Sequence, residues 1–143
     1  MALVEQLPSR VAGTRVMRVT AETSPGVRSR LSELYEAYNR RDVAAVLAAM
    51  TPDVVWPNGW LGGSMKGRDQ VREYWARQWA EIDPTVEPVG FSPEQDGRTA
   101  VSVRQVVRDR TTGSVVTDER LVHVYRFVDG LVSDMEIRHP GLA

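Results

Sequence analysis

Four polar side chains near the end of the chain have the types and spacing of an acid–base site. His123 and Tyr125 alternate along one predicted strand, and Asp134 and Glu136 alternate along the next. A two-residue turn at Asp129-Gly130 would pair His123 with Glu136 and Tyr125 with Asp134. An imidazole opposite a carboxylate, beside a phenol, is a general-base arrangement, because the carboxylate orients and charges the ring. The alternative is a structural pair, in which the histidine only bonds a strand neighbour.

The tryptophans supply a second candidate feature, the wall of a small-molecule pocket. Trp56 and Trp60 bracket the turn Pro57-Asn58-Gly59, and Trp75 and Trp79 follow four residues apart. Aromatic rings gathered around a turn offer apolar area and indole N–H donors to a ligand. The alternative is a hydrophobic core corner, and for Trp75 and Trp79, which share one helix face, the core reading is favoured.

Four other residues are candidates for the same pocket. Tyr38 ends the apolar stripe of the first predicted helix, and Asn58 lies between the first two tryptophans, where an asparagine also simply suits a tight turn. Arg104 and Gln105 point to opposite faces of one predicted strand. The sequence does not say which of the two faces His123.

Helical and strand patterns place these residues on an α+β domain. Residues 1–24 form an N-terminal extension without a clear period, and residues 25–143 form one domain. Start, stop and periodicity signals predict three helices: 25 to about 38, 43–50 after the N-cap Asp42, and 69–82, where Asp83-Pro84 ends the helix. Strands are predicted over 53–56, about 85–91, 99–110, 114–127 and 131–138. Three helices on one face of a curved, mostly antiparallel sheet follow.

The predicted pairing of the last two strands leaves both sheet faces partly apolar. One face carries the apolar side chains Val122, Val124, Val128, Leu131, Met135 and Ile137. Helices can cover only one face of such a sheet, so the second needs another cover. The sequence therefore predicts a homodimer formed through the sheet.

Composition excludes several classes of function. The formal net charge is −1 with no dense basic run, which argues against nucleic-acid binding. The chain has no cysteine and only two histidines, far apart in sequence, so no metal site is expected. No segment is apolar enough to span a membrane, and the first 24 residues lack the features of a signal peptide. We expect a cytoplasmic protein.

The order of motifs resembles the nuclear-transport-factor-2-like superfamily. The matching features are the helix hairpin, Asp53-Val54-Val55-Trp56, the helix start Gly67-Arg68-Asp69-Gln70-Val71, and the closing segment from His123 to Val132. This superfamily includes the SnoaL-like polyketide cyclases and the ketosteroid isomerases. The resemblance covers about residues 27–138 and implies a cone-shaped fold around a cavity. Because members range from isomerases to non-catalytic scaffolds, the fold alone does not decide the reaction.

Most catalytic groups of these relatives have no counterpart here. The comparison puts the proton-shuttling aspartate of the isomerases at Asn58, their oxyanion-binding tyrosine at Leu34 and their protonated aspartate at His123. The aspartate on the last strand of the cyclases falls on Ile137. Steroid isomerisation by that mechanism is therefore disfavoured, and Glu136 would serve only if a bulge turned it into the pocket.

Three functions remain open from the sequence. The favoured one is a cofactor-independent isomerase, cyclase or dehydratase acting on a small, apolar, oxygenated substrate, with His123 as general base. In it, Glu136 or Asp134 orients the ring and Tyr125 or Asn58 stabilises an oxyanion. The others are a module that binds a small ligand without transforming it, and a dimeric scaffold whose own side chains fill the cavity.

Overall fold

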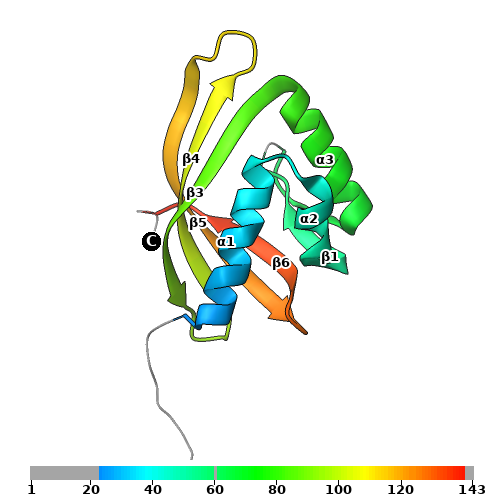
Figure 1. Cartoon of the computed structure of the whole chain (residues 1–143), viewed down its shortest axis with the longest axis vertical. Coiled ribbons are helices and arrows are strands. Elements are labelled where there is room, and N and C mark those ends of the chain that lie inside the picture. Colours follow the sequence, from blue (N-terminus) through cyan, green and yellow to red (C-terminus); the bar gives the residue numbers. More distant parts are fainter. Residues whose placement is uncertain (1–22, 60, 141–143) are drawn as a thin grey trace, which may run out of the picture.

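In the part of the chain that the structure describes, three helices lie against one face of a strongly curved six-stranded sheet (Figure 1). The computed structural model describes residues 23–59 and 61–140, so most of the expected extension over residues 1–24, and Trp60, fall outside it. The elements in chain order are α1 (Pro25–Asn39), α2 (Val43–Ala48), β1 (Met50–Pro57), β2 (Ser64–Lys66), α3 (Arg68–Glu81), β3 (Ile82–Pro93), β4 (Thr99–Asp109), β5 (Val115–Val128) and β6 (Leu131–Arg138). The α+β class predicted from the sequence is confirmed. No helix in the described ranges has the length and apolar character needed to cross a membrane.

Side-chain caps begin the first two helices, as their sequences predict. The Val27 amide donates to Ser24 Oγ over 3.3 Å, and Pro25 occupies the first turn of α1. Asp42 caps α2 by accepting from the Ala45 amide over 3.2 Å. An uncapped helix start would leave these amides without a partner, so both caps help to fix where the hairpin turns.

The third helix passes into a strand without the expected break. The sequence predicts that Asp83-Pro84 ends the helix and that the strand starts near Thr85, but β3 begins at Ile82 and contains both residues. Proline is tolerated there because β3 is an edge strand, whose outward amides need no ladder partner. Asn39, at the end of α1, bonds both the amide and the carbonyl of Val86 and so ties this edge strand to the helices.

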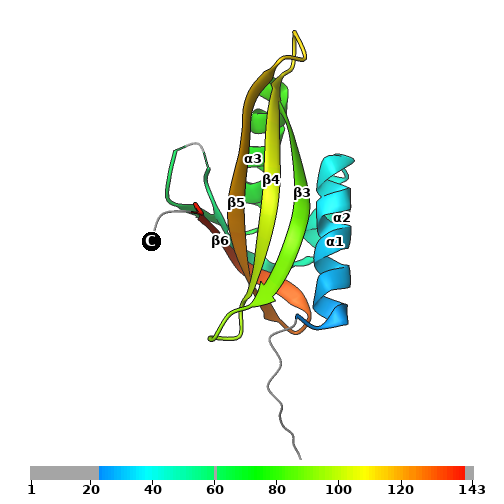
Figure 2. The same ribbon diagram turned by 90° about the vertical axis from the view of Figure 1, so that its left-hand side faces the viewer.

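The strand order is β2-β1-β6-β5-β4-β3, with β1 parallel to β6 and every other pair antiparallel. The short strand β2 was not predicted. Figure 2 views the long strands β3, β4 and β5 from the side that the helices leave open, with α3 behind them. We call the helix-covered face the inner face and the opposite one the outer face.

A β-bulge in the last hairpin changes the register that the sequence predicted. Phe127 pairs with Val132 as expected, but Arg126 then pairs with Asp134, so Ser133 is an extra residue on β6. Beyond it His123 lies opposite Ile137, not Glu136. Because strand side chains alternate between faces, this single insertion moves every following β6 side chain to the other face. The predicted pairing of His123 with Glu136 and of Tyr125 with Asp134 is wrong.

Candidate functional site

A cavity of about 780 Å³ lies between the inner face of the sheet and helices α1 and α3. Its volume is in the range of small-molecule sites. Among the residues predicted for a pocket, those that line it are Tyr38, Trp56, Asn58, Trp75, Gln105, His123, Tyr125 and Glu136. Arg104, Asp134 and Trp79 are not among its lining residues, and Trp60 lies outside the described residues.

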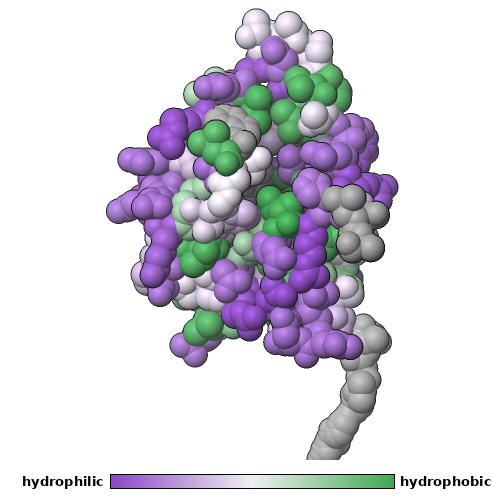
Figure 3. Space-filling model, turned by 180° about the vertical axis from the view of Figure 1, so that it is seen from behind, coloured by the Kyte–Doolittle hydropathy of each residue, from purple (hydrophilic) through white to green (hydrophobic). Residues whose placement is uncertain are grey.

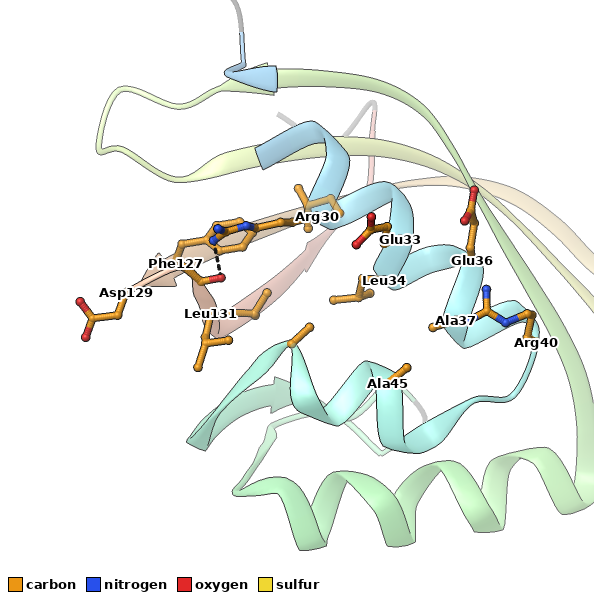
Figure 4. Close-up of a pocket in the computed structure, with 14 residues that line it drawn as sticks. Arg30, Glu33, Leu34, Glu36, Ala37, Arg40, Ala45, Phe127, Asp129 and Leu131 are labelled. Atoms are coloured by element: carbon orange, nitrogen blue, oxygen red, sulfur yellow. Dashed lines mark hydrogen bonds between the residues drawn. The ribbon is translucent and has the colours of Figure 1, made fainter. Parts of the chain in front are cut away.

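A second hollow, of about 520 Å³, lies between α1, α2 and the β5–β6 turn (Figure 4). Arg30 closes one side of it by donating from Nη1 to the Gly130 carbonyl over 2.8 Å. Its rim carries charges of both signs, including Glu33 and Arg40. No histidine or tryptophan of the described residues lines it, so the larger cavity is the candidate functional site.

Three polar side chains form a hydrogen-bonded chain in the cavity wall, which we call the Tyr–His triad: Tyr125, Tyr35 and His123. The Tyr125 hydroxyl donates to the Tyr35 hydroxyl over 2.8 Å, and Tyr35 Oη lies 2.9 Å from His123 Nδ1. Tyr35 comes from α1, whereas its two partners are alternate residues of β5. The triad thus joins the helix layer to the sheet, and its members are almost completely buried.

Burial keeps all three members of the triad uncharged at neutral pH. Removal from water lowers the pKa of His123 to about 4, because the imidazolium would lose its hydration. The same cause raises the pKa of Tyr35 and of Tyr125 well above the ordinary value. No charge therefore resides on the triad, and it acts on a ligand through hydrogen bonds.

The hydrogen-bond chain also selects the tautomer of His123. A hydroxyl carries one proton, and since Tyr35 accepts from Tyr125, its own proton is free to go to His123 Nδ1. The opposite tautomer would leave the Tyr35 proton without an acceptor in a buried place, which is costly. We assign Nδ1 as the acceptor and Nε2 as the protonated nitrogen. Nε2 makes no hydrogen bond within residues 23–59 and 61–140, so it is available to a ligand.

The two carboxylates predicted to orient His123 lie in ion pairs with arginines instead. Glu136 accepts from Arg98 over 2.8 Å and from Arg138 over 3.2 Å, and Asp134 lies 3.6 Å from Arg126. Glu136 borders the cavity, but the hydrogen bonds from Arg98 and then Arg138 hold its pKa below the ordinary value. The bulge at Ser133 is the reason, because it turns Asp134 and Glu136 toward the face of Val124 and Arg126.

The choice between Arg104 and Gln105 is settled by β4. Gln105 lines the cavity, and its cross-strand partner Glu119 lines it as well. Arg104 points the other way and makes two hydrogen bonds to Asp118, of 2.9 and 2.7 Å. Gln105 therefore shares the inner face with His123, and Arg104 does not.

The aromatic wall is both core and lining. Trp56 and Trp75 are buried, their ring centroids are 5.7 Å apart, and both border the cavity. Trp79 stacks on Trp75 with centroids 5.7 Å apart and lies under the Arg41 guanidinium. The sequence left open whether the tryptophans form a pocket wall or a core. Trp56 and Trp75 form part of the cavity wall, whereas Trp79 packs behind Trp75 and does not line the cavity.

Asn58 closes the loop that follows β1. Its Oδ1 accepts from the Leu61 amide over 2.9 Å, and its backbone bonds Gly62 and Gly63. Tyr74 on α3 fixes the same loop by accepting from the Gly59 amide over 3.1 Å. The side chain of Asn58 thus has the turn-forming role weighed from the sequence, while the residue also borders the cavity.

The cavity residues that are not candidates from the sequence include Tyr35 and Glu119. Tyr35 has the spacing of the apolar stripe of α1, and Glu119 belongs to no motif. The alternation of β5 was the available signal for Glu119, since residues 119, 121 and 123 share a face. Nothing local to α1 marks Tyr35 as a partner of His123. Within the described ranges, no group of three or more acidic, histidine or cysteine side chains is arranged to hold a metal ion.

Solved structures with this architecture include proteins that were crystallised with ligands. An NTF2-like protein of unknown function from Burkholderia pseudomallei is 28% identical, with a TM-score of 0.69 over 81% of this chain and 92% of that one. TerC, co-crystallised with polyporic acid, is 27% identical, with a TM-score of 0.67 and the same coverage. SalBIII, an epoxide hydrolase/cyclase-like enzyme with a role in pyran ring formation in the polyether salinomycin, is 22% identical, with a TM-score of 0.67 over 78% of this chain and 88% of that one, and shares the fold.

Sequence comparison gives the family directly. A search of curated proteins found no significant match. The sequence profile of the SnoaL-like domain matches residues 31–135, which is most of the chain and includes the whole Tyr–His triad. The protein belongs to the SnoaL-like domain family.

Proposed function

We propose that this protein is a cofactor-independent enzyme that closes a ring in a neutral, largely apolar substrate containing several carbonyl groups. The observation that carries the proposal is the buried, neutral Tyr–His triad, which leaves His123 Nε2–H as a hydrogen-bond donor in a cavity of substrate size. A donor held in a water-poor site stabilises negative charge that develops on a carbonyl oxygen.

The cavity lining favours an uncharged substrate. No lysine or arginine is found among the described lining residues, and the aromatic side chains Trp56, Trp75 and Tyr38 supply apolar area. A carboxylate or phosphate placed there would lose its hydration without gaining a cation. A carbonyl oxygen needs only a donor, and the triad supplies one.

The role proposed for His123 differs from the general base expected from the sequence. The arginine pairs of Glu136 and Asp134 leave the ring without a carboxylate to raise its basicity, and burial lowers the pKa of His123 to about 4. A neutral imidazole that donates from Nε2 fits this environment better than an imidazole that takes up a proton. The substrate must then supply its own reactive carbon, as the enol of a compound with a C–H group between two carbonyls does.

The proposed step is an intramolecular aldol addition, which is redox-neutral and loses no atoms. The enol carbon forms a bond to the carbon of a second carbonyl, whose π bond breaks toward oxygen. The enol proton moves to that oxygen and yields a hydroxyl group. His123 Nε2–H donates to the oxygen while the negative charge develops, and Tyr35 holds the ring by donating to Nδ1.

The test is ring closure of a synthetic linear triketone with a phenyl end, followed by chromatography and mass spectrometry. We expect wild-type protein to accelerate closure, and His123→Asn to lower the rate about a hundredfold, as loss of one oxyanion donor does. Glu87→Gln, an exposed change opposite Arg104, is the matched control and should leave the rate unchanged. Equal rates with wild type and His123→Asn would refute the assigned role of His123.

Binding without reaction is the second candidate function. Among the described residues, the carboxylates nearest His123 on β6, Asp134 and Glu136, are both paired with arginines, and this favours binding without reaction. TerC, which is 27% identical, was co-crystallised with polyporic acid, and this supports a small-molecule ligand for this protein as well. Saturable binding of the triketone, with recovery of the unchanged compound after long incubation, would favour this function over catalysis.

A further inference from the structure

We propose that Gln105 and Glu119 form a second polar subsite of the cavity, which binds a hydroxyl or amino group at the far end of an elongated ligand. This inference rests on the proposed function, in which His123 binds the carbonyl end. It adds a requirement on the substrate: a hydrogen-bond donor must lie at the opposite end of the molecule from the carbonyl.

The register brings the two side chains together. Gln105 on β4 and Glu119 on β5 are direct cross-strand partners, and both line the cavity. Such partners have their Cβ atoms about 5 Å apart, so one small polar group can reach both. An amide and a carboxylate together offer several acceptor oxygens and one pair of donors.

The same strand sets the distance between the two ends of the cavity. Glu119 and His123 are four residues apart on β5 and face the same side, which separates their backbone positions by about 13 Å. Leu121 lies between them and is buried, and Val86 on the neighbouring edge strand is buried too. A ligand that spans the cavity is therefore long, polar at both ends and apolar in the middle.

The protein itself does not satisfy these side chains. Neither Gln105 nor Glu119 makes a side-chain hydrogen bond or ion pair within residues 23–59 and 61–140, whereas the outer-face residues next to them, Arg104 and Asp118, bond each other twice. Exposure increases along the strand, from 6% at His123 to the open position of Glu119. Ligand groups that arrive at this exposed end can replace water there.

The chemistry of the subsite selects a donor. The Glu119 carboxylate accepts hydrogen bonds and cannot donate them, and no lysine or arginine borders the cavity in the described part of the chain. A phenol, alcohol or amine can donate to the carboxylate, whereas a carboxylate or phosphate would be repelled. The proposed ligand class is an elongated carbonyl compound with a terminal hydroxyl or amine.

Chalcone and para-hydroxychalcone form a matched pair of probes, because they share a carbonyl and two rings and differ in one hydroxyl. Binding is measured by quenching of tryptophan fluorescence, since Trp56 and Trp75 border the cavity. We expect wild-type protein to bind the hydroxylated probe about tenfold more tightly, the effect of one hydrogen bond to a charged, partly solvated acceptor. The ratio of the two dissociation constants is the measured quantity, so general losses of affinity cancel.

Glu119→Ala should reduce the ratio to about one, and Gln105→Ala should reduce it partly. Glu87→Ala removes an exposed strand glutamate that lies opposite Arg104, and it should leave the ratio as in wild type. Circular dichroism verifies the fold of each variant. A ratio near one in wild type, or one that Glu119→Ala leaves unchanged, would overturn the subsite.

The carbonyl end is tested separately with chalcone alone. His123→Asn should weaken chalcone binding, because the donor at Nε2 is lost. If chalcone binds equally to His123→Asn while the ratio still depends on Glu119, the proposed role of His123 fails and the subsite stands. If neither probe quenches the fluorescence, both proposals are overturned.

Discussion

Burial decides what the polar residues of this cavity can do. His123 is 6% exposed and Tyr125 is 1% exposed, so the neutral forms of both are strongly favoured. A charged group in that position would need a partner of opposite sign, and the carboxylates that could have provided one are bound to Arg98, Arg138 and Arg126. The triad therefore acts through hydrogen bonds from uncharged groups. Tyr35 fixes the direction of these bonds, because it accepts from Tyr125 and donates to His123 Nδ1.

The lowered pKa of His123 predicts a loss of stability in mild acid. Well above pH 6.5 the imidazole is neutral in both the folded and the unfolded state and contributes no pH dependence. Below pH 6.5 the imidazole takes up a proton in the unfolded chain, whereas in the folded protein it stays neutral down to about pH 4, so the free energy of unfolding falls. The free energy of unfolding should fall by about 1 to 2 kcal/mol between pH 6.5 and 5. Urea denaturation at a series of pH values measures this slope.

His123→Asn provides the control for that slope. Asparagine does not titrate, and its amide oxygen can still accept from Tyr35. The aspartates whose pKa is lowered by their own partners, such as Asp96 and Asp109, protonate below this window and act equally in both proteins. If the variant loses as much stability as wild type between pH 6.5 and 5, the assignment of a neutral, buried His123 is wrong.

The two tyrosines of the triad should not be equivalent. Tyr35→Phe removes the middle of the chain and leaves both the Tyr125 hydroxyl and His123 Nδ1 without partners, at a cost of about 2 to 4 kcal/mol. Tyr125→Phe removes only the first donor, so we expect about 1 kcal/mol. Thermal and chemical denaturation give the comparison. Nitrogen NMR of the imidazole should also show that Tyr35→Phe, and not Tyr125→Phe, loses the single Nε2–H tautomer. Equal effects of the two substitutions would argue against Tyr35 as the donor to His123 Nδ1.

At the scale of elements, the sequence predicts most helices and strands, but it does not predict the extra residue on β6 that sets the register of the last hairpin. The helices follow from caps and periodicity, and the strands from alternation, because these signals are local. Ser133 carries no such signal, although its hydroxyl donates to the Arg126 carbonyl across the bulge. Without the bulge, Glu136 would oppose His123; with it, Ile137 does. The same limit hides Tyr35, whose partners are 88 and 90 residues away in the chain.

The β5–β6 turn is held against α1 by a hydrogen bond from the Arg30 side chain to the Gly130 carbonyl. Gly130 has φ +81°, and a Cβ at this position would overlap Arg30 Nη1, which donates to the Gly130 carbonyl (Figure 4). Gly130→Ala should therefore destabilise the protein by about 1 kcal/mol through backbone strain, with a smaller further loss because the flexible Arg30 side chain must move away from the Gly130 carbonyl.

Gly97→Ala separates the two contributions to that loss. Gly97 also has a positive φ, of +89°, but has open space around its Cβ position, so alanine there reports the strain alone, about 1 kcal/mol. The melting temperature of Gly130→Ala should accordingly fall further than that of Gly97→Ala. Equal shifts would mean that the Arg30 contact adds nothing to the fold.

For the whole molecule, the bulge changes the character of the outer face. Met135 and Ile137 were predicted to share an apolar face with Val124, but they lie on the inner face and border the cavity. The outer face carries Arg98, Arg126, Glu136 and their partners in a network of ion pairs. Val124 is nevertheless 0% exposed. Figure 3 views the molecule from the side opposite to Figure 1, and there the hydrophobic side chains form separate patches among hydrophilic ones.

The homodimer through the outer face of the sheet stays a prediction. The bulge makes its expected interface polar, whereas the sequence predicted an apolar one. Each carboxylate of the network already has an arginine within the same chain, so two copies can meet without burying an unpaired charge. Contacts between exposed charges are screened by salt, whereas contacts between apolar faces are not. Sedimentation velocity should therefore detect a dimer at low ionic strength whose fraction falls as salt is added. Arg98→Glu, which gathers three acidic side chains at Asp96 and Glu136, should shift the equilibrium to monomer, and Arg72→Glu, on α3 away from the outer face, serves as the control. A dimer that resists both salt and Arg98→Glu would have to form through another surface.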